Sequence, residues 1–263
     1  MNAALLQIEN RSEPYFDRCM EINKEYCKQH KIDYIRGHGY DNFSPYWWKV
    51  VGILELMEKS PHFKIVAWMD SDAFVYDAAF DFRLFLKRSS KTMIVSPDPV
   101  FKGKNWGSPF MAAVFFVRNS RKGREIIRNW LQYYDSKVWQ KQVTNTWTCL
   151  GCQWADDNYE QGAFAKKILP KYKDSITVLP WYILHEVKHN NPHAFTWSIH
   201  IPGCIKDNRP NYPRKKIQRE NFASSEDSQQ VDAGKNDQSR TIHLPFLILF
   251  LTILLIILSL YFF

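Results

Sequence analysis

Residues 65–69 read IVAWM, five apolar residues without the polar alternation of a half-exposed strand. Such a run is typical of a strand that is covered on both faces, as in a parallel sheet between helices. Segments of helical periodicity, residues 15–30 and 46–60, alternate with the earlier strand-like runs AALLQIE and KIDYIRG. The order strand, helix, strand, helix, strand predicts an α/β domain with a largely parallel sheet.

The alternation of apolar runs continues to about residue 212. Further strands are expected at residues 92–98, 111–119 and 175–180, and further helices at residues 120–135 and 158–172. Residues 218–240 are instead polar, rich in Ser, Asp and Gln, and nearly free of large apolar side chains, which is typical of a flexible segment. We therefore expect one domain over residues 1–212 and a flexible basic and polar tether over residues 213–243.

Residues 244–263, LPFLILFLTILLIILSLYFF, contain no charge over 20 residues. A helix of that length spans roughly 30 Å, the thickness of the bilayer hydrocarbon core, so the segment is predicted to be a transmembrane helix. No signal-peptide pattern precedes it, and Lys235 and Arg240 stand on its amino-terminal side. We therefore expect a single-pass, tail-anchored membrane protein whose domain faces the cytosol.

Charge and cysteine content add two expectations. The formal net charge of +8 favours anionic partners such as phosphate groups or an acidic membrane face. The five cysteines are an odd number and so form no closed disulfide framework. CLGC at residues 149–152 is a single Cys-x-x-Cys pair. We expect these cysteines to be reduced, in agreement with a cytosolic domain.

The apolar run 65–69 is followed by two carboxylates separated by one serine, Asp70 and Asp72. Ligands of parallel α/β sheets bind beyond the carboxyl ends of the strands, and alternate residues of an extended segment point the same way. Both carboxylates can then reach one Mg²⁺ or Mn²⁺ ion, which prefers oxygen ligands and keeps positions for substrate phosphates. The alternative is an acidic turn that caps a following helix, because Asp and Ser are good N-caps.

Several longer motifs occur in a fixed order along the chain. They are YWWKV at 46–50, AWMDSDAFV at 67–75, NWGSPFMAAVFFVRNSRKGREIIRNW at 105–130, DDNYEQGAFAKKIL at 156–169 and SIHIPGCIK at 198–206. Together they resemble nucleotide-sugar glycosyltransferases of the GT-A architecture, in particular the galactosyl-, mannosyl- and xylosyltransferase family of fungal mannan and plant xyloglucan synthesis. The resemblance covers about residues 5–206. It implies an α/β, Rossmann-like nucleotide-diphospho-sugar transferase fold with a DxD motif.

The resemblance also implies roles for individual residues. Metal ligands would be Asp70, Asp72 and His200; donor-binding residues would be Asp70, Asp72, Lys49, Gly203 and Lys206; catalytic residues would be Glu160, Gln161, Asp157 and Asp156. Glu160 or Asp157 would stabilise the oxocarbenium-like centre or orient the acceptor, and Gln161 would bind donor hydroxyls. Lys206 departs from the family pattern, because Ile205 separates it from the cysteine that the basic residue usually follows. The end of the first strand, residues 9–11, is expected to face the nucleotide base.

The implied activity is the metal-dependent transfer of a hexose or pentose, with retention, from a UDP- or GDP-sugar to a glycan or glycoconjugate acceptor. Mn²⁺ or Mg²⁺ would be the cofactor, and no nucleic-acid partner is expected. One alternative is a haloacid-dehalogenase-like phosphatase that uses Asp70 and Asp72, although Phe74 stands where such enzymes usually have Thr or Val. The other is a non-catalytic, tail-anchored adaptor that keeps a transferase fold.

Overall fold

A computed structural model of the 263-residue chain describes residues 1–98, 100–101, 104–105, 107–144, 146–186 and 196–200. All of them belong to one compact unit, Met1–Arg214. The predicted tether and the predicted membrane span lie outside the described residues, as do Gly203 and Lys206. Within the described ranges, none of the helices combines the length and the apolar character needed to cross a bilayer.

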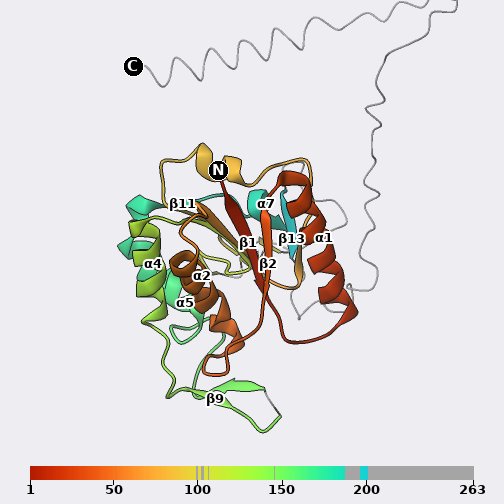
Figure 1. Cartoon of the computed structure of the whole chain (residues 1–263). Helices are drawn as coiled ribbons and strands as arrows, with labels where there is room; N and C mark the ends of the chain where they lie inside the picture. Colours follow the sequence, from red (N-terminus) through yellow and green to blue (C-terminus); the bar gives the residue numbers. More distant parts are fainter. Residues whose placement is uncertain (99, 102–103, 106, 145, 187–195, 201–263) are drawn as a thin grey trace, which may run out of the picture. The chain divides into compact units, whose positions relative to one another are not determined.

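Six strands form the central sheet: β1 (Ala3–Ile8), β2 (Asp33–Gly37), β3 (Ile65–Met69), β5 (Met93–Val95), β8 (Val114–Arg118) and β11 (Ile176–Val178). Their order across the sheet is β11-β5-β8-β3-β1-β2. Figure 1 shows β11 on one side of the sheet and β1 and β2 on the other. β1 is parallel to β2 and β3, and β5 is parallel to β11. β8 is antiparallel to both of its neighbours. The prediction of a parallel-rich α/β sheet is therefore confirmed, with β8 as the exception.

Helices lie in all four predicted segments: α1 (Pro14–His30), α2 (Trp48–Lys59) after a 3₁₀ turn at Pro45–Trp47, α4 (Arg121–Leu131), and α5 (Glu160–Ala163) with α6 (Leu169–Lys171). The short helices α3 (Arg83–Lys87) and α7 (Trp181–Leu184) and the 3₁₀ turn Lys173–Ser175 were not predicted. A π-helical segment, Phe164–Ile168, stands between α5 and α6 where one α-helix was predicted. Pro170 lacks the N–H that a continuous α-helix would use there.

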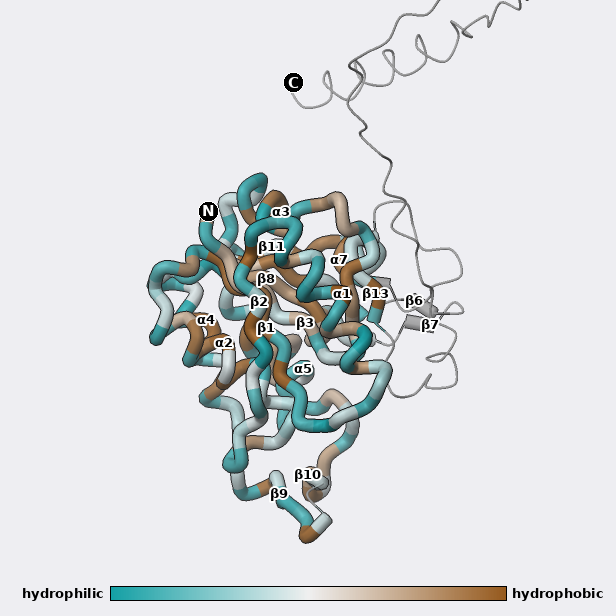
Figure 2. The backbone as a smooth tube through the Cα atoms, turned by 45° about the vertical axis from the view of Figure 1, so that its right-hand side comes forward, coloured by the Kyte–Doolittle hydropathy of each residue, from teal (hydrophilic) through white to brown (hydrophobic). Residues whose placement is uncertain are grey.

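Side chains of β3 alternate between two hydrophobic cores, one on each face of the sheet, because successive residues of a strand point to opposite faces. Val66 and Trp68 pack in the core that α2 and α4 cover. Ile65, Ala67 and Met69 pack in the core that contains buried residues of α1, α3 and α7. All five are buried, as the unbroken apolar run predicts. In Figure 2 the backbone tube is brown, the colour of hydrophobic residues, along central strands such as β8.

Smaller sheets extend the domain. β4 (Ala73–Val75), β12 (His185–Glu186) and β13 (Ser198–His200) form a three-stranded sheet, and β6 (Val100–Phe101) pairs with β7 (Lys104–Asn105). β9 (Trp139–Lys141) and β10 (Trp147–Cys149) form an antiparallel hairpin. In Figures 1 and 2 this hairpin projects from the end of the domain toward which β1 runs, which is the ligand-binding end of a parallel sheet.

The structure joins Cys149 and Cys152 in a disulfide, so the expectation of reduced cysteines is wrong for this pair. The backbone turns back at Gly151, which has a φ of 69°, and the two Cα atoms are 5.6 Å apart, a distance that a disulfide spans. Cys19 and Cys27 are buried and are not joined in a disulfide. Because disulfides persist in oxidising compartments, one ground for the cytosolic placement is removed. The placement itself stays a prediction.

Candidate metal and donor site

Buried polar side chains hold the turn that carries Asp70 and Asp72 at the carboxyl end of β3. The Gln7 side-chain amide donates to the carbonyl of Asp70 (3.0 Å), and the Asn23 amide donates to the carbonyl of Ala73 (2.9 Å). Gln7 and Asn23 are fully buried and hydrogen bonded to each other. The backbone of the turn that carries both aspartates is therefore held from β1 and α1.

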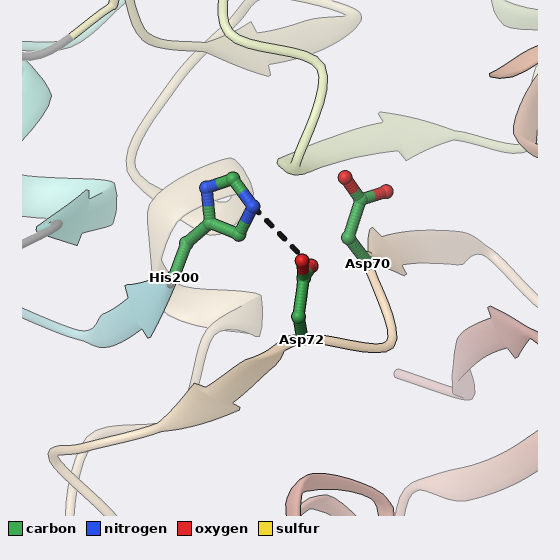
Figure 3. Close-up of side chains that lie close together, drawn as sticks. All are labelled: Asp70, Asp72 and His200. Atoms are coloured by element: carbon green, nitrogen blue, oxygen red, sulfur yellow. Dashed lines mark ion pairs between the residues drawn. The ribbon is translucent and has the colours of Figure 1, made fainter. Parts of the chain in front are cut away.

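The strand β13 brings His200 to the same place. In its antiparallel pairing with β4, His200 stands opposite Ala73, and its Nε2 lies 3.3 Å from an Asp72 carboxylate oxygen. Figure 3 shows the two aspartates and the imidazole converging. One ligand atom from each of Asp70, Asp72 and His200 lies within 4.8 Å of the others. The structure thus assembles the predicted metal ligands.

The donor set fits a divalent cation on its chemistry. Two carboxylates suit Mg²⁺ or Mn²⁺, and an added imidazole favours the softer of the two. Burial opposes charging of His200, but the adjacent Asp72 carboxylate outweighs it and raises the pKa of the imidazole. A proton on His200 and a cation at these ligands would therefore compete. A bound cation would take the place of that proton.

Lys49, in the first turn of α2, joins the metal ligands to the helix α5. Its ammonium group lies 3.1 Å from Asp70 Oδ1 and 3.0 Å from Glu160 Oε1. Only 6% of Lys49 is exposed. Burial alone would lower the pKa of Lys49, but the two carboxylates raise it, so the lysine stays charged. The Trp68 indole also donates to Asp70 Oδ1 (2.7 Å), which fixes that carboxylate further.

Glu160 and Gln161 enter the site from the start of α5, which is tied to the core because the Trp130 indole donates to the Glu160 carbonyl (2.8 Å). Burial raises the pKa of Glu160, and Lys49 opposes that effect. Its second carboxylate oxygen, Oε2, is buried without a hydrogen-bond partner among the described residues. Glu160 Oε2 therefore remains available to a ligand. Gln161 Oε1, in contrast, accepts a hydrogen bond from the backbone N–H of Ala112 (3.2 Å).

The structure places Asp156 and Asp157 in other contacts. The Asp156 carboxylate accepts the backbone N–H groups of Gln153 (2.9 Å) and Asn158 (2.8 Å), so it stabilises the turn before α5. Asp157 pairs with Lys166 and Lys167 at 2.7 and 2.9 Å on the surface. The chain brings together Asp70, Asp72, His200, Lys49, Glu160 and Gln161, and leaves these two aspartates outside that cluster.

Two buried residues beside the site did not stand out in the sequence. The Gln161 amide lies 3.4 Å from both carboxylate oxygens of Asp98, and burial raises the pKa of Asp98 to about 6. His185 accepts or donates at Nδ1 with Ser96 Oγ (3.2 Å), and burial lowers its pKa to about 3. Asp98 follows the strand run 92–98, so an acid at a strand's carboxyl end was the available signal. His185 offered none.

The end of β1 lies against the Asp70–Asp72 turn. Glu9 accepts a hydrogen bond from the Ser71 hydroxyl (2.6 Å) and forms an ion pair with Arg11 (2.7 Å). Burial opposes ionisation of Glu9, but these hydrogen bonds lower its pKa. The Arg11 guanidinium also covers the Phe16 ring at 4.4 Å. The contact of residues 9–11 with a nucleotide base stays a prediction.

Comparison with known proteins finds that the chain is similar to glycosyltransferases. Residues 2–94 match the galactosyl transferase GMA12/MNN10 family. Glycosyltransferase 6 of Arabidopsis thaliana is 24% identical over 177 residues, covering 62% of this chain and 36% of the relative. Xyloglucan 6-xylosyltransferase 4 of the same plant is 30% identical over 113 residues, covering 39% of this chain and 22% of the relative. The chain thus spans about a third or less of these relatives' length.

A solved structure shares the fold. The crystal structure of a glycosyltransferase involved in the glycosylation of the major capsid of PBCV-1 superposes with a TM-score of 0.62 at 19% identity, covering 80% of this chain and 98% of that one. This similarity and the sequence matches confirm the resemblance that the motifs predicted. The chain has the fold of a GT-A-like glycosyltransferase family, and its residues 2–94 carry the sequence pattern of the galactosyl transferase GMA12/MNN10 family.

Proposed function

We propose that the chain is a metal-dependent glycosyltransferase that moves a hexose or pentose from a nucleotide sugar to a glycan or glycoconjugate acceptor. The observation that carries the proposal is the cluster of Asp70, Asp72 and His200 at the carboxyl end of β3, within a glycosyltransferase fold. A divalent ion there, Mn²⁺ or Mg²⁺, would offset the charge that builds up on the departing nucleoside diphosphate.

Residues of the chain would hold the donor in place around this ion. Asp70 and Asp72 would bind the ion on one side, with His200 as the third ligand. Lys49 keeps Asp70 and Glu160 in fixed positions through its two short contacts. Preorganised charges of this kind stabilise a transition state without rearranging during the reaction.

Glu160 is the side chain that we expect to meet the sugar. Its Oε2 atom is buried and has no hydrogen-bond partner among the described residues, so it can accept a donor hydroxyl or face the positive charge that develops at the anomeric carbon. Gln161 is held by Ala112 and lies next to Asp98, and we expect it to bind donor hydroxyls. The family that the chain resembles transfers with retention, and we propose the same outcome here. No additional protein base is then required, since the leaving phosphate can take the acceptor proton.

Neither alternative from the sequence is favoured. A phosphatase would need a second acidic pair near the first, whereas Asp156 stabilises a turn and Asp157 pairs with surface lysines. The shared fold is that of a glycosyltransferase. A direct test is release of nucleoside diphosphate from UDP- and GDP-sugars in the presence of Mn²⁺, with no hydrolysis of an aryl phosphate. A phosphorylated Asp70, trapped on the protein, would contradict the transferase.

The metal assignment can be tested by thermal unfolding of the full chain. MnCl₂ together with UDP or GDP should raise the melting temperature more than either addition alone, because the ion and the diphosphate would bind together at one site. A ligand at about 100 times its Kd adds about 2.7 kcal/mol to the stability of the folded state. Asp72→Asn should remove that gain. The matched control is Asp174→Asn, an exposed acid outside the cluster, which should keep it. An equal gain in both variants would contradict the metal site.

A further inference from the structure

Four aromatic rings form a continuous cluster beside α5, which we call the aromatic platform: Tyr46, Trp139, Trp154 and Tyr159. The Trp154 ring centroid lies 5.5 Å from that of Tyr46 and 5.0 Å from that of Tyr159. Tyr46 and Trp139 both contact Tyr159, at 5.0 and 5.1 Å. Yet Trp154 is 66% exposed. Trp154 thus contacts its neighbours in edge-to-face geometry while much of its indole ring stays open to solvent, so the ring can stack against the face of a ligand ring.

The aromatic platform is held rigidly. The Trp139 indole donates to the Asn158 carbonyl (3.1 Å), and the Trp47 indole donates to the same oxygen (3.0 Å). Gly162 of α5 has no room for a side chain, since a Cβ there would stand 1.9 Å from the Asp156 carbonyl oxygen. The loop that carries Trp154 therefore packs directly on α5. The Cys149–Cys152 disulfide lies two residues before Trp154 in the chain.

The aromatic platform is continuous with the candidate site. Tyr159 immediately precedes Glu160, and Tyr46 precedes Lys49 by one helical turn. Burial raises the pKa of both tyrosines, and the Glu160 carboxylate contributes to both shifts, which places both phenol groups within electrostatic reach of Glu160. A molecule that lies on Trp154 and extends along these tyrosines would therefore approach the residue that we expect to meet the sugar.

We propose that the aromatic platform binds the acceptor glycan, with a pyranose ring stacked on Trp154; this inference rests on the glycosyltransferase function proposed above. A sugar ring has an apolar face that packs on an aromatic ring and hydroxyls at its rim. Exposed amide side chains that can bond such hydroxyls stand on the hairpin and its loop: Gln140, Gln142 and Gln153. A second copy of the chain would need about 800 Å² of well-packed surface on each partner. Between Trp139 and Trp147 the described side chains of the hairpin are exposed and, apart from Val143, polar.

The experiment is saturation-transfer NMR on the full chain with cellopentaose, maltopentaose and mannopentaose as probes. At least one pentasaccharide should receive saturation from the wild-type protein. Trp154→Ala should weaken its binding about tenfold, and Trp154→Phe, which keeps a flat ring, should restore most of it. Tyr133→Ala removes an aromatic side chain that is 40% exposed outside the aromatic platform and serves as the matched control. Circular dichroism melting establishes that each variant is folded.

Several results would overturn the assignment. They are equal binding by wild type and Trp154→Ala, no saturation of any pentasaccharide, or a dimer in sedimentation that Trp154→Ala dissolves. The Mn²⁺ and nucleoside diphosphate melting experiment on the same wild-type preparation reports the donor site separately. If the wild-type protein shows no thermal gain from Mn²⁺ and nucleoside diphosphate but binds a pentasaccharide through Trp154, that result would count against the proposed function. The reverse result would count against the aromatic platform alone.

Discussion

Lys49, Asp70 and Glu160 form a charged cluster. It meets the aromatic platform at the peptide bond between Tyr159 and Glu160, but the two are built in opposite ways. Lys49 and Glu160 are buried, and each charge depends on the other. The aromatic platform leaves its outermost ring, Trp154, open to solvent and is fixed by ring contacts and by the hydrogen bond of the Trp139 indole. The first arrangement couples chemistry to folding stability. The exposed ring of the aromatic platform can be substituted without loss of the fold, which suits a surface that selects an acceptor.

The largest effect should follow from breaking the charged cluster. Lys49→Met leaves the Asp70 and Glu160 carboxylates near each other without a cation. Removing one partner of a buried ion pair costs about 3–5 kcal/mol. Lys59→Met on the same helix is the matched control, because Lys59 pairs with Glu55 on the surface and such pairs contribute about 0–1 kcal/mol. Urea unfolding of both variants measures the difference.

Equal losses for Lys49→Met and Lys59→Met would show that the charged cluster is no more coupled to stability than an ordinary surface pair. A second readout sharpens the comparison. If Lys49 holds Asp70 in position, Lys49→Met should also reduce the thermal gain from MnCl₂ with UDP or GDP, whereas Lys59→Met should leave that gain in place. A variant that loses stability but keeps the full gain would separate the lysine from the metal site.

A smaller effect is expected from the disulfide that precedes Trp154 in the chain. Replacing both Cys149 and Cys152 with serine removes the restraint on a four-residue loop, which the chain-entropy estimate values at about 2 kcal/mol. The loop that presents Trp154 should also become more mobile, so pentasaccharide binding should weaken while the charged cluster is unaffected. Thiol alkylation before and after reduction checks the bond itself. Free thiols at both positions without reductant would contradict the disulfide.

Of the site residues, Asp70 and Asp72 were predictable from the residue pattern itself, whereas Lys49, Glu160 and His200 were assigned through the family resemblance. An apolar run that ends in two aspartates predicts a buried strand with carboxylates at its carboxyl end, and β3 with Asp70 and Asp72 is that strand. The antiparallel direction of β8 was not predictable, since an apolar run carries no sign of its direction. The aromatic platform was missed for a similar reason. Its rings come from separate stretches, residues 46, 139, 154 and 159, and only the fold brings them together.

The disulfide shows a second limit of pattern reasoning. A count of five cysteines indicates no closed framework, and that argument treats all thiols alike. The pairing depends on a local turn, with Gly151 in the left-handed region, and a composition count does not contain that conformation. The predicted roles of Gly203, Lys206 and the membrane span concern residues outside those that the structure describes.

The smallest effect is expected at Asp157, the exposed counterpart of Glu160. Hydrogen bonds from Lys166 and Lys167 lower the pKa of Asp157 below its ordinary value of 3.8. A carboxyl with a lowered pKa stabilises the fold above its unfolded pKa, and the stabilisation is lost as the pH falls through the folded pKa. Asp157→Asn should therefore cost less than about 1 kcal/mol at pH 7, as exposed pairs do. The cost should shrink below about pH 4, as unfolding curves at several pH values would show.

Sugar transfer by the same variant decides how the two carboxylates divide the work. Because Asp157 pairs with two surface lysines while Glu160 Oε2 is buried without a partner among the described residues, Asp157→Asn should lower the transfer rate by less than about threefold. Glu160→Gln keeps the shape but removes the charge, and should lower the rate on the order of 10²-fold, as loss of a preorganised electrostatic contact does. The reverse ranking would move the reacting centre to the surface acid that the sequence motif also contains, and would end the distinction between a buried chemical site and an exposed binding surface.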